Sequence, residues 1–144
     1  AGFTREVQVV DANEILKAAQ ATLRGSMPFP EIVASLMGNG VESYFVDYVS
    51  RSFILYGAEG AVVHAPLTFE ELPAIAAAFD KASLKAAILD SQQHGQTFRD
   101  FSTRAVRAGV QGYMAFLRGQ RVTYFGRQGD QHTEWFPGAR PNEP

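Results

Sequence analysis

Two stretches of this chain decide its fold: GVESYFVDYVSRSFILYGAEG at residues 40–60 and GVQGYMAFLRGQRVTYFGRQG at residues 109–129. They align without a gap when Gly40 is placed on Gly109, and the alignment extends back to Phe29. Three glycines recur at expected helix ends and turns, where a positive φ is often needed. We therefore predict a tandem duplication. The alignment has six identities in 32 positions: Phe29/Phe98, Gly40/Gly109, Val41/Val110, Tyr44/Tyr113, Gly57/Gly126 and Gly60/Gly129.

Each copy is predicted to contain two helices followed by three strands. Capping residues and glycines bound the helices, and runs of β-branched and aromatic residues mark the strands. A further helix at 69–79 is expected between the copies, because Thr68 and Glu71 form a capping box. The expected helices in the copies are 12–23, 30–38, 83–93 and 98–108. The expected strands are 41–49, 52–57, 61–65, 110–117, 121–125 and 131–136.

These elements predict an α+β fold within a single domain of 144 residues. The tandem helix–helix–three-strand motif should form one pseudo-symmetric, mostly antiparallel sheet packed by helices. Two copies are too few for a solenoid, which generally needs three or more. Repeat one is placed at about 11–66, the linker helix at about 67–79 and repeat two at about 80–137, and 138–144 is expected to be a disordered tail.

The central strands have no polar face. In 41–49, Phe45 and Val49 point to one side while Tyr44 and Val46 point to the other, and 110–117 is similar. A sheet with one face in water usually alternates apolar and polar residues. We therefore expect both faces to be covered, one by helices and the other by a partner, a ligand or more chain. This pattern is the main reason to predict a homodimer or a pocket.

Composition excludes several kinds of protein. The chain has no cysteine, so disulfides, zinc–thiolate sites and thiol nucleophiles are excluded. No apolar run is long enough for a transmembrane helix, so no membrane span is predicted. The opening stretch AGFTREVQ lacks the basic and apolar regions of a signal peptide, so the expected location is cytoplasmic. A net charge of −2 argues against a protein that mainly binds phosphate backbones.

Charge is nevertheless uneven along the chain. Residues 98–144 contain seven Arg and four Asp/Glu, whereas residues 1–97 contain six Lys/Arg and 11 Asp/Glu. Attraction between the halves across one surface is the favoured explanation. Two alternatives are an anionic-ligand site built from guanidinium groups and, less favoured, nucleic-acid binding by arginines and aromatic rings.

No catalytic constellation is found. The sequence lacks G-x-S-x-G and a three-glycine dinucleotide fingerprint, so a non-enzymatic binding or protein-interaction module is favoured over an enzyme, with no cofactor and no metal. The alternative is a small-molecule- or metal-binding pocket around Asp47, His64, His132 and Glu134. Two histidines and a carboxylate would suit a divalent ion. Ordinary hydrogen bonds at strand ends are the favoured role for these residues.

Positions where the two copies differ are the first places to look for a site. Asp47 matches Phe116, and Ala58 matches Arg127. A carboxylate among apolar residues needs a partner, and Arg51, Arg118 or Arg121 is expected to supply it. The candidate ligand-binding residues combine rings with charged groups: Tyr44, Asp47, Arg51, Tyr113, Arg121, Arg127, His132 and Glu134.

Three phrases resemble the YdfO/YbcV-like family, a bacterial group of unknown function that is found in enterobacterial prophages. They are FPEIVASLMGNGVESYFVDYV (29–49), ILYG (54–57) and AGVQGYMAFLRGQRVTYFGRQGDQHTEWFP (108–137). The family's phrases are matched by residues 40–48, 124–127 and 132–137, and the resemblance covers about 15–137. It implies an α+β fold with a duplicated motif. It implies no activity, although some members are labelled "phage envelope protein".

Overall fold

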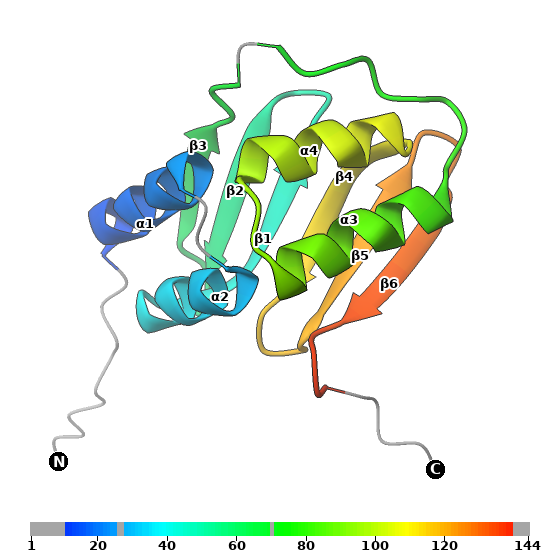
Figure 1. Cartoon of the computed structure of the whole chain (residues 1–144). Helices are drawn as coiled ribbons and strands as arrows, with labels where there is room; N and C mark the ends of the chain where they lie inside the picture. Colours follow the sequence, from blue (N-terminus) through cyan, green and yellow to red (C-terminus); the bar gives the residue numbers. More distant parts are fainter. Residues whose placement is uncertain (1–10, 26–27, 70, 140–144) are drawn as a thin grey trace, which may run out of the picture.

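The structure is a computed structural model that describes residues 11–25, 28–69 and 71–139 (Figure 1). In these residues, four helices and six strands follow one another as two copies of the order α–α–β–β–β. The helices are α1 (Ala12–Arg24), α2 (Phe29–Gly38), α3 (Lys81–Gln93) and α4 (Phe98–Arg107). The strands are β1 (Val41–Asp47), β2 (Ser52–Gly57), β3 (Val62–Pro66), β4 (Val110–Phe116), β5 (Arg121–Gly126) and β6 (Gln131–Trp135).

The predicted duplication is confirmed, including its local irregularities. Every element of the second copy begins and ends at the position that the alignment of Gly40 with Gly109 assigns to it. A strand irregularity between Val41 and Ser43 recurs at the matching place in β4. Arg51 and Gln120, which occupy equivalent positions in the two copies, both have a φ of 57°. Because few non-glycine residues adopt a positive φ, its recurrence at matched turns indicates that the two turns share one geometry.

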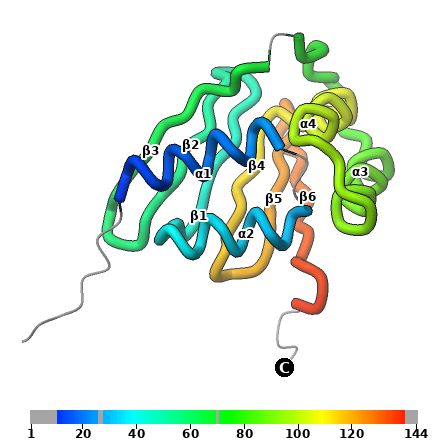
Figure 2. Tube along the Cα trace, turned by 60° about the vertical axis from the view of Figure 1, so that its left-hand side comes forward, coloured from blue at the N-terminus to red at the C-terminus, as the bar shows by residue number. Residues whose placement is uncertain are grey.

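One antiparallel sheet joins the two copies. Its strand order is β3-β2-β1-β4-β5-β6, so the copies meet where β1 pairs with β4. The four helices lie on the same face of this sheet, with α1 and α2 over the first half and α3 and α4 over the second (Figures 1 and 2). The α+β architecture follows the prediction, but among the described residues helices cover only one of the two sheet faces.

The core lies between the helices and the covered face of the sheet. Alternate strand residues such as Val46, Phe53 and Leu55 have no exposed side-chain surface. Buried polar groups in this layer find partners: the Tyr48 hydroxyl donates to Ser102 Oγ over 2.9 Å. The period-2 alternation therefore places one set of side chains under the helices and the other set on the opposite face.

The linker helix predicted at about 67–79 is wrong. Residues 71–80 contain no helix, and this segment crosses the end of α4 instead. Ala76 N–H donates to Val106 O over 3.0 Å, and Asp80 N–H donates to Ala108 O over 2.7 Å. Pro73 disfavours helical geometry in the residue before it. The N–H groups of Ala76 and Asp80 bond to carbonyls at the end of α4 instead of to carbonyls within a helix of their own.

The predicted tail at 138–144 falls mainly outside the described residues, which end at 139. The part that is described forms a turn, in which Ala139 N–H donates to Phe136 O over 2.9 Å.

Candidate functional site

The predicted site residues divide between the two faces of the sheet. Cross-strand partners point to the same side of a sheet, so the pairing of strands assigns each residue to a face. Asp47 shares the uncovered face with Gly112, and His64 shares it with Ile54. His132 pairs with the buried Tyr124 on the helix-covered face. The predicted pocket around Asp47, His64, His132 and Glu134 is therefore not formed.

A one-residue difference in register separates the two histidines that the sequence analysis matched. Tyr56 pairs with Val62, and its counterpart Phe125 pairs with Gln131, so Val62 and Gln131 are equivalent positions of β3 and β6. His64 is therefore equivalent to Thr133 and not to His132. Because strand side chains alternate, one residue of difference sends the two rings to opposite faces.

Asp47 has a structural partner that the sequence analysis did not foresee. Its Oδ1 accepts from Val49 N–H over 2.8 Å and from Ser50 N–H over 3.2 Å. An aspartate that bonds the backbone in this way initiates a turn. β1 ends at Asp47, two residues earlier than predicted, and β4 ends at the matched Phe116, so the strand end is common to both copies and does not depend on the aspartate. No arginine pairs with Asp47 in the part of the chain that the structure describes.

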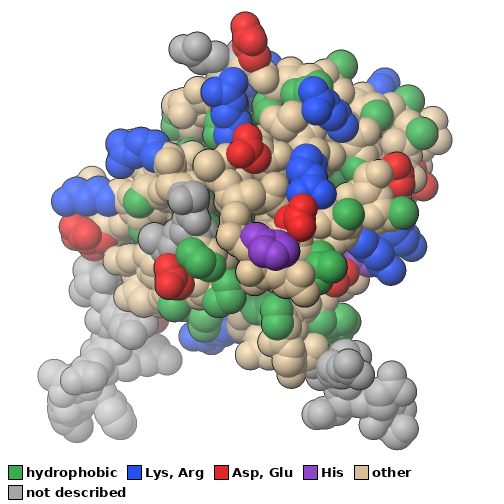
Figure 3. All heavy atoms as spheres, in the orientation of Figure 1, with side chains coloured by type: hydrophobic (Ala, Val, Ile, Leu, Met, Phe, Trp, Pro, Cys, Tyr) green, Lys and Arg blue, Asp and Glu red, His purple; other side chains and the backbone are tan. Residues whose placement is uncertain are grey.

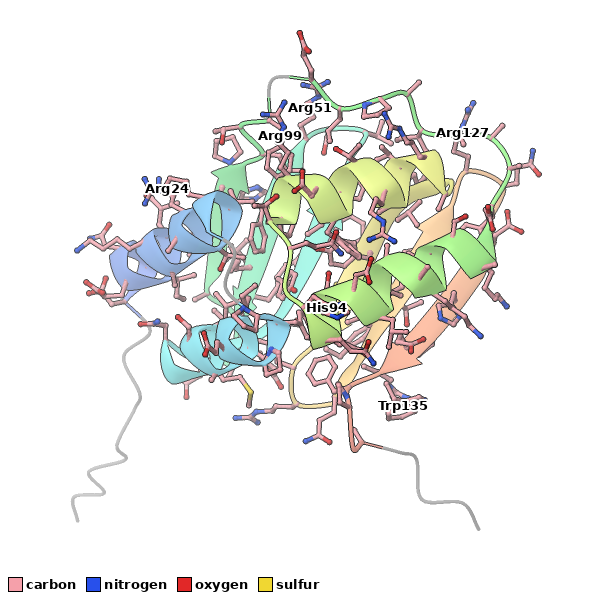
Figure 4. The ribbon with its side chains drawn as sticks, in the orientation of Figure 1. Arg24, Arg51, His94, Arg99, Arg127 and Trp135 are labelled. Carbon is pink, nitrogen blue, oxygen red and sulfur yellow. The ribbon has the colours of Figure 1, made fainter. Side chains whose placement is uncertain are left out.

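The candidate arginines do not converge with the candidate tyrosines. Arg51 donates to Phe69 O over 3.2 Å, and Arg127 donates to Ile75 O over 3.1 Å. Both lie beside the segment that links the two repeats, at the opposite end of the molecule from Trp135 (Figure 4). The Arg121 guanidinium lies 4.9 Å from the centroid of the Trp135 ring, away from the helices. These three arginines support turns and an edge strand.

Three of the remaining candidates, Tyr44, Tyr113 and Glu134, line a cavity between the two repeats. We call it the inter-repeat cavity. Its volume is about 70 Å³, and part of it is open to solvent, so it has room for a small group but not for a drug-sized molecule. Both repeats contribute to its walls. The described lining residues are Thr22, Gly25, Phe29, Ile32, Tyr44, Ile88, Ser91, Gln92, Gln96, Phe98, Phe101, Tyr113, Val122, Tyr124, Glu134, Trp135 and Phe136.

Three buried tyrosines form the sheet side of this cavity. The ring centroids of Tyr44 and Tyr113 are 6.2 Å apart, and those of Tyr113 and Tyr124 are 5.2 Å apart. Burial raises the pKa of all three hydroxyls above the usual value, because the ionised form loses its hydration. The hydroxyls therefore stay neutral and can both donate and accept hydrogen bonds.

One carboxylate belongs to the cavity wall. Glu134 Oε2 lies 2.7 Å from His132 Nε2, and the His132 ring stacks against Tyr124 with centroids 6.4 Å apart. The His132 side chain is 10% exposed and that of Glu134 is 33% exposed. His132 and Glu134 therefore lie together, and their contact is a hydrogen bond between the two side chains. Among the described residues, no three His, Asp or Glu side chains form a possible metal site.

The uncovered face of the sheet is apolar at its centre, and we call it the open face. The sequence pattern indicated this second apolar face, and the strand register confirms which residues occupy it. Phe116 is 38% exposed, and Val62, at the edge, is 51% exposed. By contrast, positive and negative side chains are interspersed over the helix face (Figure 3). The apolar side chains at the centre of the open face are Phe45, Ile54, Tyr56, Met114, Phe116 and Phe125.

Sequence reasoning missed the helix-borne part of the cavity. Gln92 in α3 and Phe101 in α4 line it, and no motif marks them. Whether these residues line the cavity depends on how the helices pack on the sheet, and the spacing of residues in the sequence does not determine that packing.

Comparison with known proteins gives a family but no activity. The sequence model of a family described as "Protein of unknown function (DUF1398)" matches residues 17–133. Uncharacterized proteins of Mycobacterium tuberculosis (strain ATCC 25618 / H37Rv) and Mycobacterium bovis are each 39% identical to the chain over 66 residues. That match covers 45% of this chain and 40% of each relative, so less than half of the relatives' length is spanned. No helix in the described residues has the length and apolar character needed to cross a membrane.

Proposed function

The chain belongs to the DUF1398 family, whose function is unknown. We propose that it is a non-enzymatic interaction module that pairs with a second copy through its open face. The observation that carries the proposal is the one-sided sheet. Four helices bury one face, whereas the other presents apolar side chains from four neighbouring strands, β2, β1, β4 and β5. An exposed patch of this kind is typical of an interaction surface.

The open face has the size that a specific dimer needs. Six strands spaced by about 4.8 Å, each about five residues long at about 3.4 Å per residue, cover about 500 Å² in projection. Two such faces in contact would bury about 1,000 Å² or more, which is the lower bound for a specific interface. Stacked sheets separated by about 10 Å would then form a sandwich with a second core.

The charge distribution favours a second copy as the occupant. Two charged groups that the strand register places on the open face lie at strand ends and have partners within the chain: Asp47 bonds the turn, and Arg121 lies over Trp135. The central side chains are uncharged, so two identical faces meet without like-charge repulsion. A strongly charged partner would gain nothing at this centre.

Met114→Asp is expected to separate the two copies. Met114 lies opposite Phe45 at the junction of the repeats, so in the dimer two carboxylates would be buried near each other. We expect dimer affinity to fall by about 100-fold or more, as for a central interface residue. Sedimentation velocity at about 10 μM measures this, because wild type should sediment as a dimer and the variant as a monomer.

Leu89→Asp is the matched control. Leu89 is a 49% exposed apolar residue on α3, on the helix side of the molecule, and its replacement should leave the dimer intact. Circular dichroism checks that each variant folds, and Phe116→Asp replaces Met114→Asp if the latter does not. A dimer that survives Met114→Asp or its replacement, or that dissociates equally with Leu89→Asp, rules out the open face as the interface.

Other parts of the functional picture stay predictions. A cytoplasmic location and a relation to the prophage-associated YdfO/YbcV-like proteins rest on the sequence alone. Nucleic-acid binding is not favoured by the arginines of the second half, because Arg104 pairs with Asp90 and Arg118 lies 3.9 Å from Glu42. The geometry therefore gives more support to an interaction module.

A further inference from the structure

The inter-repeat cavity lies on the other side of the sheet from the open face, so a role for it does not depend on dimer formation. Aromatic rings form much of its wall, including Tyr44, Tyr113 and Tyr124 from the sheet and Phe101 from α4. Apolar walls with a few convergent polar groups are typical of small-molecule sites. The body of a ligand that fits here must therefore be largely apolar.

The charge of the cavity restricts the ligand further. Among the described lining residues, Glu134 is the only one with a charged side chain, and no Lys, Arg or His is part of the wall. Arg104 lies behind Gln96, but it is paired with Asp90. An anionic ligand would meet a carboxylate and no Lys, Arg or His among the described wall residues, whereas a cationic ligand would gain an ion pair.

Glu134 is placed to meet such a cation at the entrance. A second, more open hollow on the surface shares Gln92, Glu134, Trp135 and Phe136 with the cavity, so these residues stand where the two spaces join. Oε2 of Glu134 is bonded to His132, whereas Oε1 makes no hydrogen bond with the described residues. The carboxylate is thus fixed in position and still has an oxygen available.

The ring faces add a second attraction for positive charge. A cation within about 6 Å of a tyrosine or phenylalanine centroid is stabilised by the negative potential of the ring face. The tyrosine hydroxyls of the wall stay neutral, so they add hydrogen-bonding capacity without a charge of their own.

We infer that the inter-repeat cavity binds a small organic cation, an amine with an apolar aromatic or aliphatic body, whose ammonium group pairs with Glu134 while its body lies among the rings. This class combines an apolar body with one positive charge, which are the two properties that the wall selects. The site uses residues of both repeats, so ligand binding would also join the two halves of the domain.

Three probes of equal size test the inference on the full chain: benzylamine, benzyl alcohol and benzoate. They share one ring and differ in charge, being cationic, neutral and anionic at pH 8. Saturation-transfer NMR and calorimetry should rank them in that order. Benzylamine is expected to bind about tenfold more tightly than benzyl alcohol, and benzoate should show no binding.

Glu134→Gln identifies the carboxylate responsible. This isosteric variant is expected to lower benzylamine affinity about tenfold, to that of benzyl alcohol, and to leave benzyl alcohol unchanged. Glu42→Gln is the control, because it removes the same charge from a 42% exposed side chain outside the cavity and should change nothing. This control distinguishes an ion pair between benzylamine and Glu134 from the general attraction of a cation to a chain with a net charge of −2.

Three results would overturn the inference: benzoate binding as well as benzylamine, an unchanged preference for the amine in Glu134→Gln, or no binding by any probe. If Glu134→Gln fails to fold, the ranking of the three probes on the wild-type chain decides the question by itself.

Discussion

Replacing Gly109 by alanine is expected to lower the free energy of unfolding by about 3 kcal/mol or more. Gly109 follows α4 with a φ of +92°, a conformation that costs an L-residue about 1–2 kcal/mol. A Cβ atom would also stand 2.2 Å from the Ala78 carbonyl oxygen and 2.9 Å from Phe79 Cα. These are backbone atoms, so no flexible side chain can move aside.

The linking segment cannot retreat easily from the added methyl group. Hydrogen bonds from Ala76 and Asp80 tie it to the carbonyls of Val106 and Ala108 on both sides of the contact. Relief of the clash would break these bonds or shift α4, and overpacking of this kind costs about 1–3 kcal/mol beyond the backbone strain. Urea unfolding followed by circular dichroism measures the total.

Gly129→Ala provides the matched control. Gly129 has nearly the same φ, +89°, but a Cβ atom there would meet nothing within 4 Å. Its replacement should cost only the backbone strain, about 1–2 kcal/mol. Equal losses for the two variants would show that Gly109 is required for its φ alone and that the linking segment is not packed against it.

Phe53→Ala is expected to lower the free energy of unfolding by about 3–5 kcal/mol. Phe53 has no exposed side-chain surface, and its ring lies between others: its centroid is 5.0 Å from that of Tyr44 and 6.2 Å from that of Phe98. Truncation leaves a cavity that strands on either side cannot close, since their spacing is fixed by backbone hydrogen bonds. Calorimetric unfolding gives the loss directly.

The duplication supplies a control for Phe53. Val122 occupies the equivalent position in the second copy and is 4% exposed. Val122→Ala removes fewer atoms and should cost about 1–3 kcal/mol. A loss as large as that of Phe53→Ala would mean that the second repeat carries more of the core than the burial indicates.

The sequence predicted most of the fold because the same signals occur twice. Gly40 and Gly109 mark helix ends in both copies, and the alternation around Tyr44 and Tyr113 identifies the central strands. The prediction of a helix at 67–79 was wrong because the capping pair and apolar residues of this segment resemble the start of a helix. What decides its conformation is contact with the end of α4, which is remote in sequence.

The candidate site was predictable only in part, for a similar reason. Tyr44, Tyr113, His132 and Glu134 were identified and do lie on one face. His64 was assigned to the same group but lies on the opposite face of the sheet. An error of one residue in the strand register is enough to place a side chain on the wrong face. Gln92 and Phe101 line the cavity because of the way α3 and α4 pack on the sheet, so no local sequence pattern predicts their position in the wall.

The mass of the full chain in solution tests pairing through the open face most directly. Light scattering over a range of about 5–200 μM needs no variant and no ligand. If two open faces pair, the mass at the upper concentrations should be twice the 15.8 kDa of one chain. A mass of 15.8 kDa at every concentration would contradict the proposed function.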